Sequence, residues 1–150
     1  MPRLAATNVG TGPDGRPIYR PIIIVSIEIG GRIVQGPALV DSGADNTLVP
    51  FDAVAPLGVD FLQLPRGPGG SGPGGTLDVR VCQGKLRWDN RMLMTEFMVA
   101  EPTKGPGAIL LGRADFFTLY VARFQWHKNP PVFDLDPGRP SKMTSDRAFG

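Results

Sequence analysis

The sequence contains very little cysteine, histidine and net charge. Its single cysteine, Cys82, excludes an intrachain disulfide and a cysteine-based zinc site, and it suits a reducing compartment. The only histidine, His127, lies in an expected turn and is predicted at the surface. The net charge is only +2 and Lys and Arg form no dense run, so nothing indicates a nucleic-acid partner.

Long apolar segments are also missing. The longest apolar stretch, residues 21–25, is far too short to span a bilayer. No charged start followed by an apolar run and a cleavage site marks a secretory signal. We therefore expect a cytoplasmic protein with no membrane partner.

Glycine and proline, by contrast, are abundant. The 20 glycines and 16 prolines make up nearly a quarter of the 150 residues, about double their average share. Both residues are poor in helix interiors, which argues against a helical bundle or a coiled coil. Disorder throughout is also excluded, because 41% of the residues are hydrophobic and the net charge is small. The composition predicts one turn-rich domain that is mostly β.

The pattern along the chain divides it into three parts. Residues 1–19 have no apolar period and are predicted to be a flexible arm or an edge extension, residues 20–137 the folded domain, and residues 138–150 a disordered tail. Hairpins are expected around Gly30-Gly31 and around residues 129–131. Short helices are expected over residues 50–57 and 113–120. Further strands are predicted over residues 38–40, 61–64, 77–82, 85–88 and 92–100, with turns at residues 83–84 and 89–90.

Asp41-Ser42-Gly43 is the first stretch that indicates chemistry. It directly follows the apolar run of residues 38–40, and a carboxylate that leaves a buried strand is costly unless hydrogen bonds satisfy it. The small neighbours allow close approach of the backbone, so the triplet could hold a carboxylate at the floor of a cleft. On the triplet alone, an ordinary turn at the end of a strand is the favoured interpretation, because Asp, Ser and Gly are common in turns. A calcium loop over residues 41–45 has too few further acidic ligands nearby.

The surrounding residues resemble a known family. Three elements occur in order: residues 38–49 with Asp41-Ser42-Gly43-Ala44 at their centre, the glycine-rich residues 67–75 followed by Thr76-Leu77-Asp78-Val79-Arg80-Val81, and Ile109-Leu110-Leu111-Gly112-Arg113 before a short helix. Together they resemble the active-site signature, the flap and the second signature element of retropepsin-like aspartic proteases. The resemblance spans residues 20–137 and implies an all-β fold: a closed barrel with one or two short helices and a glycine-rich flap hairpin.

The resemblance also implies roles for residues near the triplet. Asp41 is the expected catalytic residue, and Ser42 is expected to hydrogen-bond across a subunit interface. Gly43 is expected to offer its carbonyl to the substrate main chain, with Ala44 and Asp45 completing the loop. An ion pair between Asp45 and Arg113 is expected to hold this loop against the helix after Gly112. No cofactor and no metal ion are implied.

The glycine-rich segment is the expected flap. A flexible linker is the alternative interpretation, and a phosphate-binding loop fits poorly because no Gly-Lys-Ser/Thr follows. A flap must open for substrate and close to exclude water, and glycine supplies that freedom. Leu77 and Leu110 are candidate substrate contacts, although Leu110 is equally well explained as core. The expected flap residues are Gly70, Ser71, Gly72, Pro73, Gly74, Gly75 and Leu77.

Two functions follow from this interpretation. The mechanism of the family needs two carboxylates that share a proton, and the sequence holds one Asp-Ser/Thr-Gly triplet. We therefore expect a homodimer in which two copies of Asp41 meet on the two-fold axis and cleave a polypeptide substrate. The hairpin predicted within residues 121–135 is expected to contribute to the interface. The alternative is a non-catalytic module of the same fold that binds peptides or dimerises.

Overall fold

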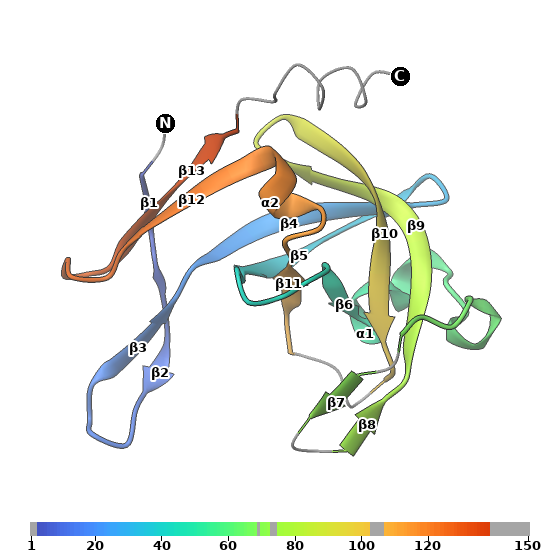
Figure 1. The fold of residues 1–150 in the computed structure, drawn as a ribbon, viewed down its shortest axis with the longest axis horizontal. Helices are drawn as coiled ribbons and strands as arrows, with labels where there is room; N and C mark the ends of the chain where they lie inside the picture. The colour runs from blue at the N-terminus through green and yellow to red at the C-terminus, as the bar shows by residue number, and fades with distance from the viewer. Residues whose placement is uncertain (1–2, 69, 73–74, 103–106, 139–150) are drawn as a thin grey trace.

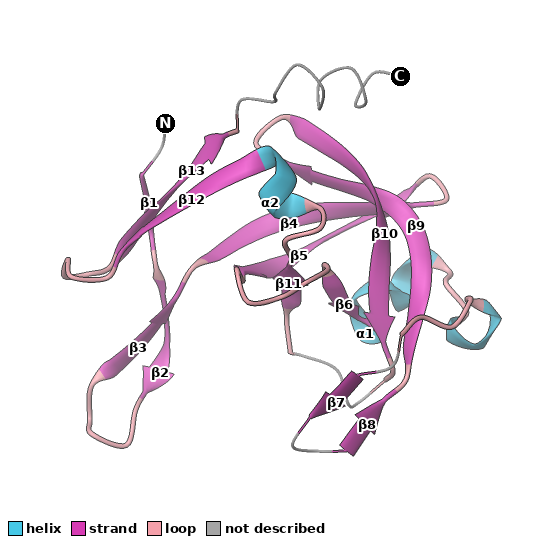
Figure 2. Ribbon diagram, in the orientation of Figure 1, coloured by secondary structure: helices cyan, strands magenta, loops and turns pink. Residues whose placement is uncertain are grey.

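A closed barrel of six strands forms the centre of the molecule (Figures 1 and 2). The computed structural model describes residues 3–68, 70–72, 75–102 and 107–138. The strands follow the order β10-β6-β11-β5-β4-β9 around the barrel. Their bounds are β4 Ile22–Ile29, β5 Arg32–Val40, β6 Leu48–Pro50, β9 Val79–Trp88, β10 Arg91–Ala100 and β11 Ile109–Leu111. The all-β class and the closed barrel predicted from the sequence are confirmed.

Two tight turns join neighbouring strands of the barrel. Gly30 and Gly31, with φ of 59° and 80°, connect β4 to β5. Asp89 and Asn90, with φ of 51° and 62°, connect β9 to β10. Such two-residue turns need a left-handed backbone at both positions, which Gly, Asn and Asp tolerate best. Both turns were predicted from the sequence and both are confirmed.

The barrel interior is filled by apolar residues at alternate strand positions. On β4, Ile23, Val25 and Ile27 are buried, whereas Ile24 between them is 59% exposed. The alternation follows from the pleat, which turns successive side chains to opposite faces of a strand. The largest fully buried side chains are Phe97, Phe116, Phe133, Ile27, Leu111 and Leu135.

A smaller sheet of three strands packs beside the barrel in the order β1-β13-β12. Its strands are β1 Arg3–Ala5, β12 Tyr120–Gln125 and β13 Val132–Pro137. The hairpin expected around residues 129–131 is therefore confirmed. A separate hairpin of β2 (Thr7–Thr11) and β3 (Pro17–Arg20) projects away from the barrel (Figure 1). Residues 3–20 thus contain the three strands β1, β2 and β3. Of the two structures expected for the start of the chain, β1 is the edge extension of a sheet and not a flexible arm. The tail predicted as disordered lies outside the described residues from residue 139 onward.

Short helices cap the barrel strands. The α-helix α1 (Phe51–Val54) continues into the 3₁₀ helix η1 (Ala55–Leu57), and Gly58 ends this segment with a left-handed φ of 82°. The α-helix α2 (Phe116–Leu119) precedes β12. Both helices lie where the sequence predicted them. No helix within the described ranges is long and apolar enough to cross a membrane.

Three local predictions were wrong. The strand expected over residues 61–64 is instead the 3₁₀ helix η2 (Phe61–Gln63), because the Asp60 carboxylate accepts the N–H of Leu62 at 3.2 Å and starts a helical turn. Residues 38–40 form no separate strand, since β5 runs on through Gly36 and Pro37 in register with β4. The turn expected at residues 83–84 does not occur, and β9 is continuous.

Gly84 explains the last of these errors. A Cβ at this position would lie 2.6 Å from the ring of Phe97 and 2.8 Å from the carbonyl oxygen of Glu28. The glycine therefore allows close packing between β9 and its neighbours rather than a reversal of the chain. From the sequence alone, a glycine that allows close packing within a strand cannot be distinguished from a glycine in a turn.

Candidate active site

The loop of residues 41–47 connects β5 to β6, and its first residue is half-buried Asp41. The N–H of Gly43 donates to Oδ1 of Asp41 at 3.0 Å, and the N–H of Ala44 donates to the Asp41 carbonyl at 3.1 Å. This is the local turn that a short carboxylate side chain forms with its own backbone. An added Cβ at Gly43 would lie 3.2 Å from Asp41 Oδ1, so the glycine lets the backbone approach the carboxylate. The turn fixes Asp41 while its second oxygen makes no hydrogen bond within the described residues.

The strand β11 holds this loop from the side. It pairs in parallel with β5, and Leu111 lies opposite Val40 at the end of the pairing. The N–H of Asp41 then donates to the carbonyl of Leu111 at 3.3 Å. Leu111 is fully buried and Leu110 is half-buried opposite Leu48 of β6, so both belong to the wall behind the loop.

The residues after β11 bond to the same loop. The N–H of Arg113 donates to Ala44 O at 2.9 Å, and the N–H of Ala114 donates to Asp45 O at 2.8 Å. A Cβ on Gly112 would overlap the backbone of Asn46, so this position accepts glycine alone. The two signature elements seen in the sequence are therefore brought together by backbone contact.

Asp45 and Arg113, expected as an ion pair, are in contact. Nη2 of Arg113 donates to Oδ1 of Asp45. The Asp45 side chain is 81% exposed and that of Arg113 is 58% exposed, and ion pairs this exposed contribute about 1 kcal/mol or less. The backbone bonds of the same segments carry most of the attachment.

Asp115 is a residue that the sequence analysis did not single out. Its buried carboxylate accepts the hydroxyl of Thr47 at 2.5 Å and the N–H of Phe116 at 2.8 Å through Oδ1. Its Oδ2 accepts the hydroxyl of Thr95, on β10, at 2.9 Å. Thr47 in turn accepts the N–H of Gly112 at 3.1 Å. An Asp at the start of a predicted helix was the available signal, because Asp is a favoured N-cap residue.

The expected flap forms a hairpin of β7 (Gly70–Gly72) and β8 (Gly75–Leu77), seen at the lower end of the molecule in Figure 1. Gly70 pairs with Leu77 and Gly72 pairs with Gly75. The intervening Pro73 and Gly74 lie outside the described residues. Leu77, the candidate for substrate contact, is half-buried at the base of the hairpin.

Arg80 anchors the base of this hairpin. The residue lies in the strand expected over residues 77–82 and is only 6% exposed. Its guanidinium donates to the carbonyl of Leu64 at 3.0 Å and to the carboxylate of Asp78 at 3.1 and 3.2 Å, and it lies 5.0 Å from the centre of the Phe61 ring. The hydrogen bond from Arg80 lowers the pKa of Asp78, against a smaller opposing effect of burial. A buried arginine satisfied on several sides fixes the strand from which the hairpin projects.

The site also lacks the features of a metal centre. Within the described ranges, no three His, Cys, Asp or Glu side chains gather closely enough to hold a metal ion. The groups of the loop are the carboxylates of Asp41 and Asp45, the hydroxyl of Ser42 and backbone groups, with the guanidinium of Arg113 beside Asp45.

Comparison with known proteins gives the fold a name. No family model matches the sequence. No curated protein matches it either. Among solved structures, a retropepsin-like aspartic protease from Rickettsia conorii is similar with a TM-score of 0.57 and 11% identity, over 89% of this chain and 99% of that one. EIAV protease complexed with the inhibitor HBY-793 is similar with a TM-score of 0.49 and 24% identity, over 63% of this chain and 83% of that one. The chain therefore has a retropepsin-like fold.

Proposed function

We propose that this chain is an aspartic endopeptidase that uses Asp41 as its catalytic residue. The observation that carries the proposal is the half-buried carboxylate of Asp41, held by Gly43 at the end of β5 with one oxygen left without a hydrogen bond in the described part of the chain. The retropepsin-like fold supports it, because the similar structure from Rickettsia conorii is that of a retropepsin-like aspartic protease.

The chemistry requires a second carboxylate, which we propose comes from a second copy of the chain. In a two-fold dimer Asp41 faces Asp41 of the second copy. Two carboxylates within about 3 Å of each other share one proton, as in aspartic proteases generally, because like charges so close cannot both be ionised. The ionised carboxylate takes a proton from a water molecule while its mate donates a proton to the scissile carbonyl oxygen. The water oxygen bonds to the carbonyl carbon, and the C–N bond then breaks with a proton passing to the leaving nitrogen.

The remaining site residues position the loop and the substrate in this proposal. Ser42 bonds across the interface, and the carbonyl of Gly43 and the side chain of Asp45 bind the substrate main chain. The β7–β8 hairpin closes over the substrate, with Leu77 and Leu110 as apolar contacts. Edge strand β12 carries Phe124 at 41% exposure, and Trp126 follows the end of the strand at 42% exposure. The β12–β13 hairpin contributes to the dimer interface in our proposal.

The test compares Asp41→Asn with Asp52→Asn on a mixed peptide library. Asp52 is an exposed residue of α1, so its substitution makes the same chemical change away from the loop. We expect the first variant to lose about a thousandfold or more of the hydrolysis rate and the second to retain it. A statine-type transition-state mimic should inhibit the unaltered chain. Hydrolysis that survives in the Asp41 variant would contradict the mechanism.

Sedimentation of the active protein tests the second copy. Activity should appear only at concentrations that populate the dimer, and a strictly monomeric active species would rule out the shared dyad. A dimer that binds peptides but never cleaves them would instead favour a binding module of the same fold.

A further inference from the structure

A hollow on the outer face of the barrel has no role in the proposed function. It has a volume of about 410 Å³ and lies beside the β9–β10 turn. Ile24 and Ser26 of β4, Gln35 of β5 and Met92 of β10 contribute to its lining. We call it the outer hollow; Arg87, Trp88, Asp89, Asn90 and Arg91 complete it.

The charges of the outer hollow are unbalanced. Arg87 and Arg91 line it, and Asp89 is its only acidic residue, which leaves a net charge of +1. Neither arginine lies within ion-pair distance of a carboxylate in the described part of the chain. On the same face, Lys85 is paired with Glu28 at 3.2 Å. The two guanidinium groups therefore keep donors that an added carboxylate could use.

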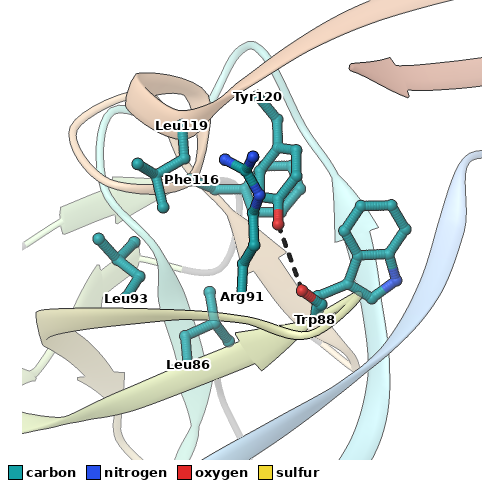
Figure 3. A pocket seen from close by; sticks show the side chains of 7 residues that line it. All are labelled: Leu86, Trp88, Arg91, Leu93, Phe116, Leu119 and Tyr120. Atoms are coloured by element: carbon teal, nitrogen blue, oxygen red, sulfur yellow. Dashed lines mark hydrogen bonds between the residues drawn. The ribbon is translucent and has the colours of Figure 1, made fainter. Parts of the chain in front are cut away.

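Tyr120, at the start of β12, contacts two residues of the outer hollow (Figure 3). The hydroxyl of Tyr120 donates to the carbonyl of Trp88 at 3.2 Å, and the two rings meet edge to face at 5.2 Å. The guanidinium carbon of Arg91 lies 6.0 Å from the centre of the Tyr120 ring. Because these contacts already order Trp88 and Arg91, a ligand would lose less conformational entropy on binding there.

The outer hollow is remote from the candidate active site. β9 begins at Val79, one residue after the β7–β8 hairpin, and its ten residues end at Trp88. A strand of that length extends about 30 Å. In Figure 1 the β9–β10 turn and the β7–β8 hairpin accordingly lie at opposite ends of the molecule.

We propose that the outer hollow binds an acidic segment of a polypeptide. Its carboxylate would pair with Arg87 and Arg91, the amides of Gln35 and Asn90 would bond to peptide groups, and Met92 would contact apolar side chains. A nucleic acid fits less well, because two arginines in one hollow do not form the extended basic track that a phosphate backbone needs. The proposal goes beyond hydrolysis and stands whether or not Asp41 is catalytic.

The experiment measures binding of a fluorescent ten-residue peptide rich in Asp and Glu to the full chain by anisotropy. A peptide of the same length with Asn and Gln in their place is the neutral probe. Both are also measured with the Asp41→Asn variant, so that hydrolysis cannot remove the probe. We expect the acidic peptide to bind at least about fivefold more tightly, with an affinity that falls as NaCl is added.

Single substitutions locate the binding. Arg87→Gln and Arg91→Gln should each weaken binding of the acidic peptide by about five- to tenfold. Arg20→Gln is the matched control, because Arg20 is exposed on β3 and its substitution removes the same charge elsewhere. Equal affinities for the two peptides, or an equal loss in the Arg20 variant, would overturn the proposal. Tighter binding of a single-stranded oligonucleotide that Arg87→Gln abolishes would overturn it in favour of a polyanion site.

Discussion

The hydroxyl of Thr47 donates a 2.5 Å hydrogen bond to the carboxylate of Asp115, 68 residues further along the chain. The same hydroxyl accepts the N–H of Gly112 at 3.1 Å. Thr47 and Asp115 are both buried, at 0% and 7% exposure. One side chain therefore joins the end of the Asp41 loop to β11 and to the start of α2.

Thr47→Val should test this junction. Valine keeps the volume but removes one of the two hydrogen bonds at Oδ1 of Asp115, and it leaves the buried N–H of Gly112 without its partner. A hydrogen bond to a charged group contributes about 1.5–3 kcal/mol and an unsatisfied buried group costs about 1–3 kcal/mol, so the free energy of unfolding should fall by about 3 kcal/mol. Urea denaturation measures the change.

Thr118→Val is the control for that prediction. The hydroxyl of Thr118 donates to the backbone carbonyl oxygen of Asp115 at 2.6 Å. Thr118 is exposed, so water can replace this bond. We expect its cost to be below about 1 kcal/mol. Thr47→Ser, which keeps the hydroxyl, should recover most of the stability lost in Thr47→Val. A valine variant as stable as the unaltered chain would show that the hydrogen bonds of the hydroxyl do not stabilise this junction.

Gly112→Ala should be more damaging. The added methyl group would overlap the backbone of Asn46, which cannot move aside as a flexible side chain could. The loop that holds Asp41 must shift, and we expect a loss of about 3 kcal/mol or more in stability together with loss of peptide hydrolysis. Gly107→Ala is the matched control, because a Cβ there meets nothing within 4 Å. Equal melting temperatures for the two variants would contradict this account.

The contact between Asp45 and Arg113 should contribute little. In a double-mutant cycle with Asp45→Asn and Arg113→Gln, the coupling energy should stay below about 1 kcal/mol, because both side chains are largely exposed. It should vanish in about 1 M NaCl, where charges are screened over about 3 Å. A coupling of several kcal/mol that resists salt would mean that this pair, rather than the backbone bonds beside it, fixes the loop.

The sequence predicted the parts of the molecule that depend on local chemistry. Gly30-Gly31 and Asp89-Asn90 identified two turns because few residues tolerate their backbone angles. Asp41 and Gly112 were recognised as parts of short signatures. Contact between the two signatures was expected only from the family resemblance, because residue types and spacing do not show the parallel pairing of β11 with β5 on which it depends.

The predictions that failed depended on tertiary contacts. Gly84 was assigned to a turn, whereas it makes room for the ring of Phe97. The burial of Arg80 was not predicted, because it depends on the carbonyl groups of Leu62 and Leu64 and on the carboxylate of Asp78. Asp115 passed unnoticed because its partners, Thr47 and Thr95, lie 68 and 20 residues away. A sequence pattern shows residue types and spacing, but not which distant group will satisfy a buried charge.

The contact between Arg80 and Asp78 should make the stability of the fold depend on pH. The hydrogen bond from Arg80 lowers the pKa of Asp78 below its ordinary value of 3.8. The folded chain therefore binds this proton less readily than the unfolded chain, and the resulting stabilisation is complete above that value. It is lost as the pH falls through the lowered pKa of the folded state. Asp78→Asn should thus be less stable than the unaltered chain at about pH 6, and the difference should shrink toward about pH 2.5.

Urea denaturation across this pH range measures the effect, with Asp52→Asn as the control for loss of a carboxylate on the surface. In Asp78→Asn the buried guanidinium of Arg80 keeps its bonds to the carbonyl groups of Leu62 and Leu64 but has no anion beside it. The cost should therefore be greatest where Asp78 is ionised in the unaltered chain. A difference between the two chains that stays constant from pH 6 to pH 2.5 would mean that packing of the side chain, and not its charge, supports the base of the β7–β8 hairpin.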